Sequence, residues 1–246
     1  MRVALGVPCY VDQLRPSVAR ASLALLERLG CDVQLMLDAP CCGQPMANAG
    51  ATRDAVAAAT CWATASARHE TIVLPSGSCT HHIRHHLPGI APGEDGAHAA
   101  RATFELCEFI VNGLHVDRVA GRFPHRVAVH VGCHALRALR LGGASELSQL
   151  PSGPMLQLLN GLDGIDIVTL ERADECCGFG GTFAIGEPDI SVVMGRSRVR
   201  DVTSHGAAVL VSSDPSCMLH LEAIARREHA ELRIMHIAEL LEEATR

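Results

Sequence analysis

A Cys-Cys-Gly tripeptide occurs twice in this chain, and each copy is flanked by one cysteine far upstream and one far downstream. The two resulting sets are Cys9, Cys41, Cys42 and Cys79 in the first half, and Cys133, Cys176, Cys177 and Cys217 in the second. The gaps on either side of the vicinal pair are 31 and 36 residues in the first set and 42 and 39 in the second. A repeat of about 130 residues indicates domain duplication and not a solenoid. We therefore expect two halves with the same fold, each carrying one four-thiol site.

Strand-like and helix-like segments alternate along both halves. Short apolar runs at residues 2–7, 32–37, 70–74, 126–131, 165–170, 207–211 and 233–235 predict strands; residues 17–29, 47–67, 103–112, 189–204, 217–227 and 237–244 favour helices. This alternation predicts an α/β fold of two similar duplicated domains, each a mostly parallel sheet with helices on both faces. The expected division is 1–112 for the first domain, 113–125 for a linker and 126–246 for the second domain.

Every cysteine of the two sets follows a predicted strand. Ligands of parallel sheets bind beyond the carboxyl ends of the strands. Thiols that are distant in sequence are therefore expected to meet at one edge of each sheet.

The composition excludes several classes of protein. A net charge of -6 and an aromatic content of 3% disfavour nucleic-acid binding. All 21 basic residues are arginine, so a P-loop lysine and Schiff-base chemistry are excluded. No apolar run is long enough to cross a bilayer, and no signal peptide is evident, so we expect a cytoplasmic protein. Eleven cysteines in a reducing compartment bind metals more often than they form disulfides.

Four thiolates around a small concave site suit either tetrahedral Zn²⁺ or an iron–sulfur cluster of the [4Fe-4S] type. Cys79 and Cys217 are each expected near the start of a helix, where backbone N–H groups favour negative charge. Buried, inert cysteines are the competing interpretation, and the duplicated pattern makes it the weaker one.

The remaining candidate residues carry weaker signals. Cys31, Cys61 and Cys107 have no duplicated counterpart, and we expect them in the core. The histidines of the segment 80–86 are interpreted as a polar helix face in preference to a zinc site. His134 and His220 lie beside or near the set cysteines and could either tune a metal centre by hydrogen bonds or be structural. The glycines after Cys177 do not match the dinucleotide-binding spacing.

The motifs resemble those of the cysteine-rich CCG domain family, which includes the cysteine-rich subunit of heterodisulfide reductase and the iron–sulfur subunit of glycolate oxidase. The segments that carry the resemblance are 8–12, 41–45, 75–79, His130 with Cys133-His134, 173–183 and 216–220, so it spans nearly the whole chain. Heterodisulfide reductase units end in C-x-x-C and supply five cysteines. Here the corresponding segments are Ser76-Gly77-Ser78-Cys79 and Asp214-Pro215-Ser216-Cys217, so a four-ligand site is expected.

Within the family, the chain is most similar to members that serve bacterial lactate utilisation. This resemblance implies an iron–sulfur electron-transfer subunit of a complex that oxidises L-lactate to pyruvate. It also implies a ferredoxin-type iron–sulfur partner, a third subunit and no activity of the chain alone. The alternatives are a zinc-binding scaffold subunit, or zinc at one of the two sites, and a thiol-disulfide enzyme like heterodisulfide reductase.

Overall fold

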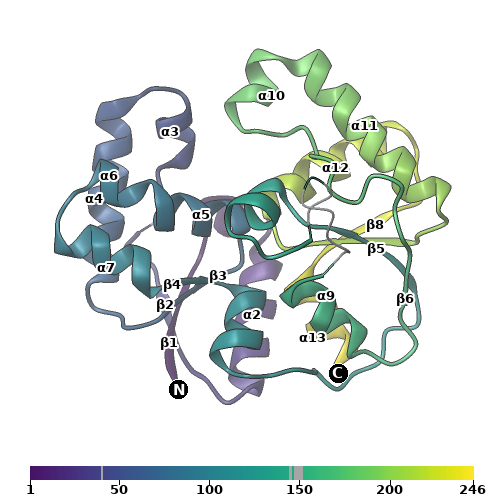
Figure 1. Ribbon diagram of the computed structural model, residues 1–246, viewed down its shortest axis with the longest axis horizontal. Helices are drawn as coiled ribbons and strands as arrows, with labels where there is room; N and C mark the ends of the chain where they lie inside the picture. Colours follow the sequence, from purple (N-terminus) through teal and green to yellow (C-terminus); the bar gives the residue numbers. More distant parts are fainter. Residues whose placement is uncertain (40, 144–145, 147–151) are drawn as a thin grey trace. The chain divides into compact units, whose positions relative to one another are not determined.

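The computed structural model describes residues 1–39, 41–143, 146 and 152–246, which divide into two compact units, Met1–Phe109 and Ile110–Arg246 (Figure 1). Each unit is built on one four-stranded sheet in which all strand pairs are parallel. The strand order is β2-β1-β3-β4 in the first unit and β6-β5-β7-β8 in the second. The two sheets therefore have the same topology, and the predicted α/β fold with two similar halves is confirmed.

The first unit contains four strands and the helices that connect them. In chain order its elements are β1 (Arg2–Gly6), α1 (Cys9–Leu14), α2 (Pro16–Arg28), β2 (Asp32–Met36), α3 (Gln44–Asn48), α4 (Thr52–Ser66), β3 (Ile72–Leu74), α5 (Gly77–His85), α6 (Leu87–Ile90), α7 (Glu94–Ala102), β4 (Thr103–Glu105) and α8 (Leu106–Glu108). A π-helical turn, η1 (Phe109–Gly113), stands at the boundary with the second unit.

The second unit repeats the strand order, but a single helix joins its last two strands where the first unit has three. Its elements are β5 (Arg126–His130), the π-helical turn η2 (His134–Ala138), α9 (Pro154–Asn160), β6 (Asp166–Ile167), α10 (Thr182–Gly186), α11 (Pro188–Ser204), β7 (Val209–Ser212), α12 (Pro215–Arg227), β8 (Arg233–His236) and α13 (Ile237–Ala244). The capping box of α8 between Glu105 and Glu108 recurs in α13 between His236 and Glu239, so even the ends of the two units correspond.

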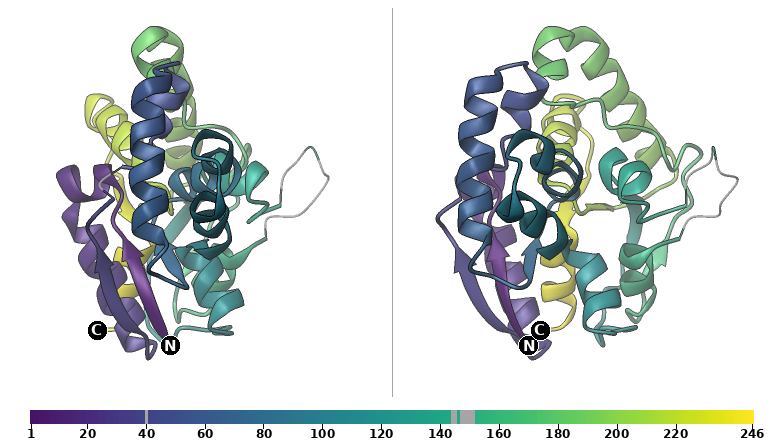
Figure 2. Two further views of the ribbon diagram at one scale, coloured as in Figure 1. Left: turned by 90° about the vertical axis from the view of Figure 1, so that its left-hand side faces the viewer. Right: turned by 60° about the vertical axis from the view of Figure 1, so that its left-hand side comes forward.

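Helices cover both faces of the first sheet. The chain leaves β1 toward β2 and later returns past β1 to β3, so right-handed crossovers place α2 and α4 on opposite faces. Figure 1 shows these two helices on either side of β1, and Figure 2 shows α4 lying along β1 and β2.

The buried clusters show which residues of the central strands lie on the same side of the sheet as α4 in the first unit and as α11 in the second. Ala4 of β1 packs in one buried cluster with Trp62 of α4, and Ala128 of β5 packs in another with Val199 of α11. Because side chains alternate along a strand, the residues two positions further on, Gly6 and His130, face the same side. Both stand at the carboxyl end of their strand.

Three expectations about secondary structure were wrong in detail. Residues 103–105 form the strand β4, paired with β3, and the predicted helix over 103–112 is reduced to α8 and η1. A short buried apolar run does not reveal by its periodicity whether it is strand or helix. The predicted helix over 47–67 is interrupted after Asn48 by a turn in which Gly50 has a φ of +72°. The strand predicted over 165–170 is shorter than expected, because β6 is confined to Asp166–Ile167.

That residues 113–125 form a linker remains a prediction. Part of it makes backbone hydrogen bonds within the second unit, because Asp163 N–H donates to the Gly121 carbonyl and Phe123 N–H donates to the Asp163 carbonyl. Over the residues that the structure describes, no helix is both long and apolar enough to span a membrane.

Candidate metal centres

The cysteines of each set lie at the carboxyl edge of their own sheet. In the first unit, Cys9 begins α1 after β1, Cys41 and Cys42 lie in the loop between β2 and α3, and Cys79 is in the first turn of α5 after β3. In the second unit, Cys133 stands after β5, Cys176 and Cys177 lie between β6 and α10, and Cys217 is in the first turn of α12 after β7. Parallel strands bring these distant thiols together at one edge.

The four thiols of the first set form a continuous series of contacts. Hydrogen bonds join Cys9 to Cys41 and Cys41 to Cys42, and the Sγ atoms of Cys42 and Cys79 are 3.5 Å apart. The backbone N–H of Gly43 donates to the Cys41 sulfur at 3.4 Å.

The second set repeats the same series. Cys133 is hydrogen-bonded to Cys176, Cys176 to Cys177 and Cys177 to Cys217. The N–H of Gly178 donates to the Cys176 sulfur at 3.4 Å, and the N–H of Phe179 donates to the Cys177 sulfur at 3.5 Å. The structure thus brings all four predicted cysteines together in each unit.

Ionisation is concentrated on the same cysteine in both sets. Hydrogen bonds from Cys42 and Cys9, supported by the Gly43 N–H, lower the pKa of Cys41 far below that of an ordinary thiol. Hydrogen bonds from Cys133 and Cys177 lower the pKa of Cys176 in the same way. The pKa values of Cys9, Cys42, Cys133 and Cys177 are raised, chiefly because each donates its proton to a neighbouring thiolate. The first cysteine of each vicinal pair is therefore the preferred thiolate.

The glycine after each vicinal pair is required by the backbone and by close packing. Gly43 has a φ of +91° and Gly178 a φ of +88°, a region that side chains rarely tolerate. A Cβ on Gly178 would lie 2.6 Å from Met194 Cβ and 2.7 Å from the Ser191 carbonyl oxygen. Only glycine lets this loop approach α11 closely enough to present its N–H groups to the sulfurs.

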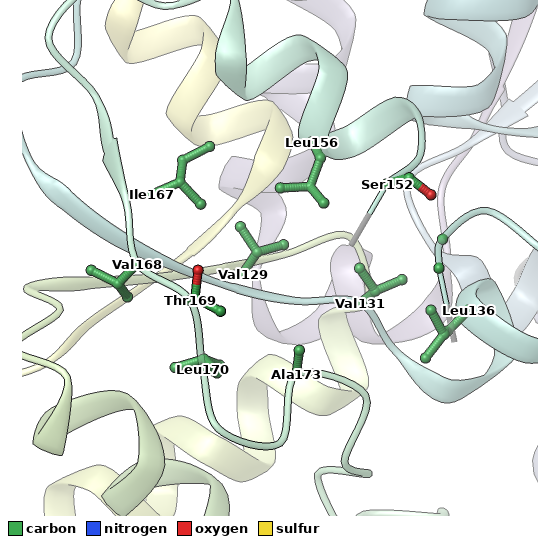
Figure 3. A pocket seen from close by; sticks show the side chains of 12 residues that line it. Val129, Val131, Leu136, Ser152, Leu156, Ile167, Val168, Thr169, Leu170 and Ala173 are labelled. Carbon is green, nitrogen blue, oxygen red and sulfur yellow. The ribbon is translucent and has the colours of Figure 1, made fainter. Parts of the chain in front are cut away.

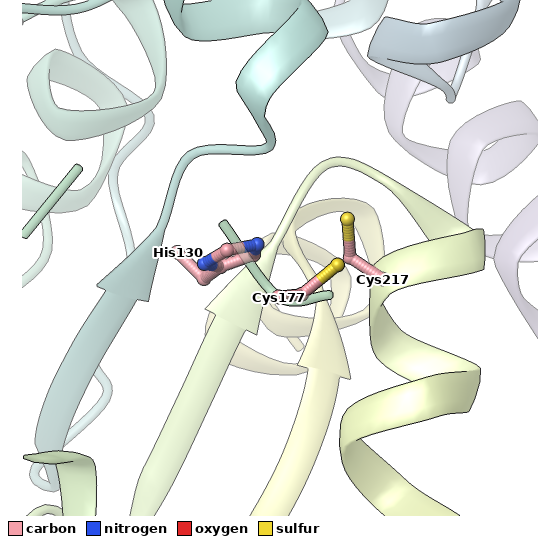
Figure 4. Close-up of side chains that lie close together, drawn as sticks. All are labelled: His130, Cys177 and Cys217. Atoms are coloured by element: carbon pink, nitrogen blue, oxygen red, sulfur yellow. The ribbon is translucent and has the colours of Figure 1, made fainter. Parts of the chain in front are cut away.

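A histidine joins the second set. The imidazole of His130, the Cys177 sulfur and the Cys217 sulfur place one ligand atom each within 4.8 Å of one another (Figure 4). His130 is fully buried, and neither of its ring nitrogens has a hydrogen-bond partner among the described residues. Burial and the nearby Arg198 lower the pKa of His130 to about 4, so the imidazole is neutral at pH 7 and keeps a lone pair for a metal.

Comparison with known proteins also finds the same kind of unit twice in the chain. Residues 3–84 and residues 127–222 each match the cysteine-rich domain family named CCG. The chain belongs to this family. Its curated relatives include proteins named lactate utilization protein A, from Exiguobacterium (38% identity, covering 99% of this chain and 98% of the relative), Geobacillus thermodenitrificans (35%, 98% and 98%) and Bacillus velezensis (37%, 98% and 99%).

Each CCG domain also contains a histidine three residues after its last cysteine, His82 in the first and His220 in the second. His82 is buried, and its charge interaction lowers the pKa of Cys41; His220 is half-buried, and its Nε2 lies 3.3 Å from the Ser191 carbonyl oxygen. The duplicated C-x-x-H spacing could have revealed this pair in the sequence, although the neighbouring histidines obscure it. His134 lies with its Nδ1 3.8 Å from the Cys133 sulfur.

A buried arginine anchors the cysteine loop of the second CCG domain. The side chain of Arg198 on α11 is 0% exposed, and its Nη2 donates to the carbonyl oxygens of Arg172 and Glu175, each at 2.6 Å. The Asp201 carboxylate, one turn further along α11, accepts from the N–H groups of Glu171 and Arg172 at 3.2 Å. These bonds fix the backbone that leads into Cys176.

The cysteines outside the two sets differ from one another. Cys31 and Cys107 are buried, as expected, and burial raises the pKa of both thiols. The expectation that Cys61 is a core residue was wrong: it is exposed on α4, where its thiol donates to the Asp38 carbonyl oxygen at 3.2 Å. In the predicted polar histidine face of α5, His85 and His86 are exposed but His82 is buried.

The second CCG domain also contains an apolar cavity, lined by side chains that include Val129, Leu136, Leu156 and Leu170 (Figure 3). Val129 precedes His130 on β5 and therefore faces the opposite side of the sheet. This cavity contains no set cysteine and is not part of the metal centre.

The donor chemistry of both sets fits a metal. Thiolates are soft ligands that select zinc or iron–sulfur clusters. Two thiolates on one ion, with bonds of about 2.3 Å, lie roughly 4 Å apart, close to the 3.5 Å between Cys42 and Cys79. The sulfurs that hold an iron–sulfur cluster are further apart, so cluster binding would open each set.

Proposed function

We propose that this chain is the iron–sulfur electron-transfer subunit of a bacterial system that oxidises L-lactate to pyruvate. The observation that supports this most is the repeated convergence of four thiols at the carboxyl edge of each sheet. The relatives named lactate utilization protein A match over nearly their whole length, and this supports lactate as the substrate of the system.

In this proposal, Cys9, Cys41, Cys42 and Cys79 hold one metal centre, and Cys133, Cys176, Cys177 and Cys217 hold the other. A bound cluster, of the [4Fe-4S] type, would supply one-electron transfer. The protein itself supplies thiolates that are easily formed at Cys41 and Cys176, and it directs the N–H groups of Gly43 and Gly178 at their sulfurs. Such N–H groups stabilise negative charge on sulfur, which is how a protein adjusts the potential of a cluster.

The chain then works with partners. A ferredoxin-type iron–sulfur protein and a third subunit are proposed to complete the system in the cytoplasm. We also propose that the chain consists of a first domain at 1–112, a linker at 113–125 and a second domain at 126–246.

A thiol-disulfide activity is the second candidate, because one observation favours it. Cys41 and Cys176 have strongly lowered pKa values and lie between other thiols, which is the arrangement of a reactive cysteine beside a resolving one. Reduction of a disulfide substrate by metal-free chain would support this activity over electron transfer.

The proposed function is tested by mixing anaerobically purified chain with L-lactate and an artificial electron acceptor, with and without the partner proteins. We expect pyruvate only when the partners are present, and loss of it when Cys177 is replaced by serine. Rapid turnover by the isolated chain would contradict an electron-transfer role.

A further inference from the structure

The two CCG domains differ at three positions beneath their cysteines, and the first two are on strands. β1 and β5 each end three residues before the first cysteine of the set, so Gly6 and His130 are equivalent. Leu5 of β1 pairs with Val73 of β3, and Val129 of β5 pairs with Val211 of β7. The residues that follow Val73 and Val211, Leu74 and Ser212, are therefore equivalent as well.

A third difference comes from the helix above the sheet. Gly43 packs against Ala55, Ala58 and Ala59 of α4; Gly178 packs against Ser191, Met194 and Gly195 of α11. These contacts align the two helices with a constant offset of 136 residues, because Ala55 corresponds to Ser191 and Ala59 to Gly195. The same offset makes Trp62 equivalent to Arg198.

The first domain has no room for an imidazole at this place. A Cβ on Gly6 would lie 2.5 Å from Leu74 Cδ2 and 3.2 Å from Trp62 Cη2, so apolar side chains fill the space below its cysteines. The second domain has three polar residues instead, His130, Ser212 and Arg198, all of which are buried. The side chains beneath the cysteines are thus apolar in the first domain and polar in the second.

We propose that His130 is a metal ligand through a ring nitrogen, in place of one of the four thiolates of the second set, which gives the second CCG domain a mixed sulfur–nitrogen site and leaves the first with sulfur alone. This inference rests on the proposed metal-binding function of the two sets. A fully buried imidazole whose two nitrogens have no hydrogen-bond partner among the described residues is costly, and such groups require a partner. The Cys177 and Cys217 sulfurs lie within 4.8 Å of a ring nitrogen of His130, and the ring is directed toward them in Figure 4.

A neutral imidazole in place of a thiolate makes a metal site less negative, and in iron–sulfur proteins such an exchange raises the reduction potential. The second site would accordingly accept an electron more readily than the first.

The test isolates the second site in the full-length chain. A background variant with Cys42→Ser and Cys79→Ser disables the first site, and Zn²⁺ is then added to the metal-free protein. X-ray absorption at the zinc edge counts the sulfur and nitrogen neighbours of the ion, and a competing chelator gives its affinity. Circular dichroism verifies that each variant is folded.

We expect nitrogen in the zinc shell of this background, its loss in His130→Ala with at least a tenfold weaker affinity, and its replacement by sulfur in His130→Cys. His220→Gln is the matched control and should keep the nitrogen. The opposite background, Cys177→Ser with Cys217→Ser, should show sulfur only.

The outcomes separate the two ideas. Zinc held by sulfur alone with His130 intact, or nitrogen retained in His130→Ala, would overturn the role of His130 and leave the proposed metal sites standing. Failure of both backgrounds and of the unmodified chain to bind any metal would overturn the proposed function as well.

Discussion

At the scale of single residues, contact with another thiol separates candidate ligands from core cysteines. All eight set cysteines contact another thiol, whereas Cys107, which also follows a strand, is buried in the core. The spacing of the sequence was sufficient to select these eight. Arg198 could not be selected in this way, because nothing in a run of residues such as Gly-Arg-Ser-Arg-Val-Arg shows which arginine is buried.

Cys177 is one of the proposed ligands of the second site. We therefore expect Cys177→Ser to weaken or abolish metal binding there, because it removes a thiolate donor. Cys107→Ser should retain the wild-type metal content, since Cys107 belongs to neither set. Metal analysis of both variants after anaerobic purification measures the difference. Equal loss of metal in the two variants would show that the ligands have been assigned incorrectly.

The buried arginine leads to a prediction about stability. Arg198→Met removes the guanidinium that contacts the carbonyl groups of Arg172 and Glu175 and the carboxylate of Asp201. This substitution should therefore lower the free energy of unfolding by about 2–4 kcal/mol. Arg200→Met, an exposed position on the same helix, should change it by less than about 0.5 kcal/mol. Urea unfolding of both variants decides the matter, and similar losses would mean that Arg198 does not anchor the cysteine loop.

At the scale of elements, the strand ends and the loops after them were largely predictable, and the short elements were not. Alternation of apolar segments predicted β1, β5 and the long helix α11. The strand β4 was missed because Thr103–Glu105 is buried through its place in the sheet beside β3, a long-range pairing that a local pattern does not contain.

The loop after the second vicinal pair should be sensitive to a single methyl group. Gly178→Ala places a side chain at a φ of +88° and against Met194 and Ser191, so we expect a loss of stability of about 2–4 kcal/mol together with weaker metal binding. Gly181→Ala is the control, because Gly181 has a φ of +62° but open space around its Cβ position. It should cost about 1–2 kcal/mol for the backbone conformation alone. Thermal unfolding measures both, and equal effects would argue against close packing on α11.

The ion pair between β8 and α13 gives a pH-dependent prediction. The hydrogen bond from Arg233 lowers the pKa of Glu243 below its ordinary value of 4.5. The folded state therefore holds the carboxylate in its ionised form more strongly than the unfolded state does. The stability from this pair is fully present above about pH 4.5 and is lost as the pH falls through the lower, folded-state pKa.

Glu243→Gln should accordingly lower stability at pH 7, by less than about 1 kcal/mol because both side chains are partly exposed, and should have no effect at low pH. A double-mutant cycle with Arg233→Gln, measured by urea unfolding at pH 7 and at pH 3, isolates the pair. A coupling energy that does not change with pH would contradict this explanation.

At the scale of the whole molecule, duplication gives each domain a four-cysteine set in the same position, and divergence changes the residues beneath it. The sequence predicted the duplication from the cysteine spacing, because ligand positions at strand ends are fixed by the fold. It did not predict the contrast between Gly6 with Trp62 and His130 with Arg198. These residues are far apart in the chain, and only the packing of α4 and α11 over the sheets brings them beneath the cysteines.

Both four-cysteine sets are proposed to hold redox-active metal centres. The decisive measurement is of iron, acid-labile sulfide and zinc in the anaerobically purified chain, together with its visible absorption before and after reduction. We predict iron and sulfide in the wild-type chain, a visible absorption band that fades on reduction, and loss of both when Cys41, Cys42, Cys176 and Cys177 are all replaced by serine. A colourless wild-type chain without iron, after purification that excludes oxygen throughout, would contradict the account.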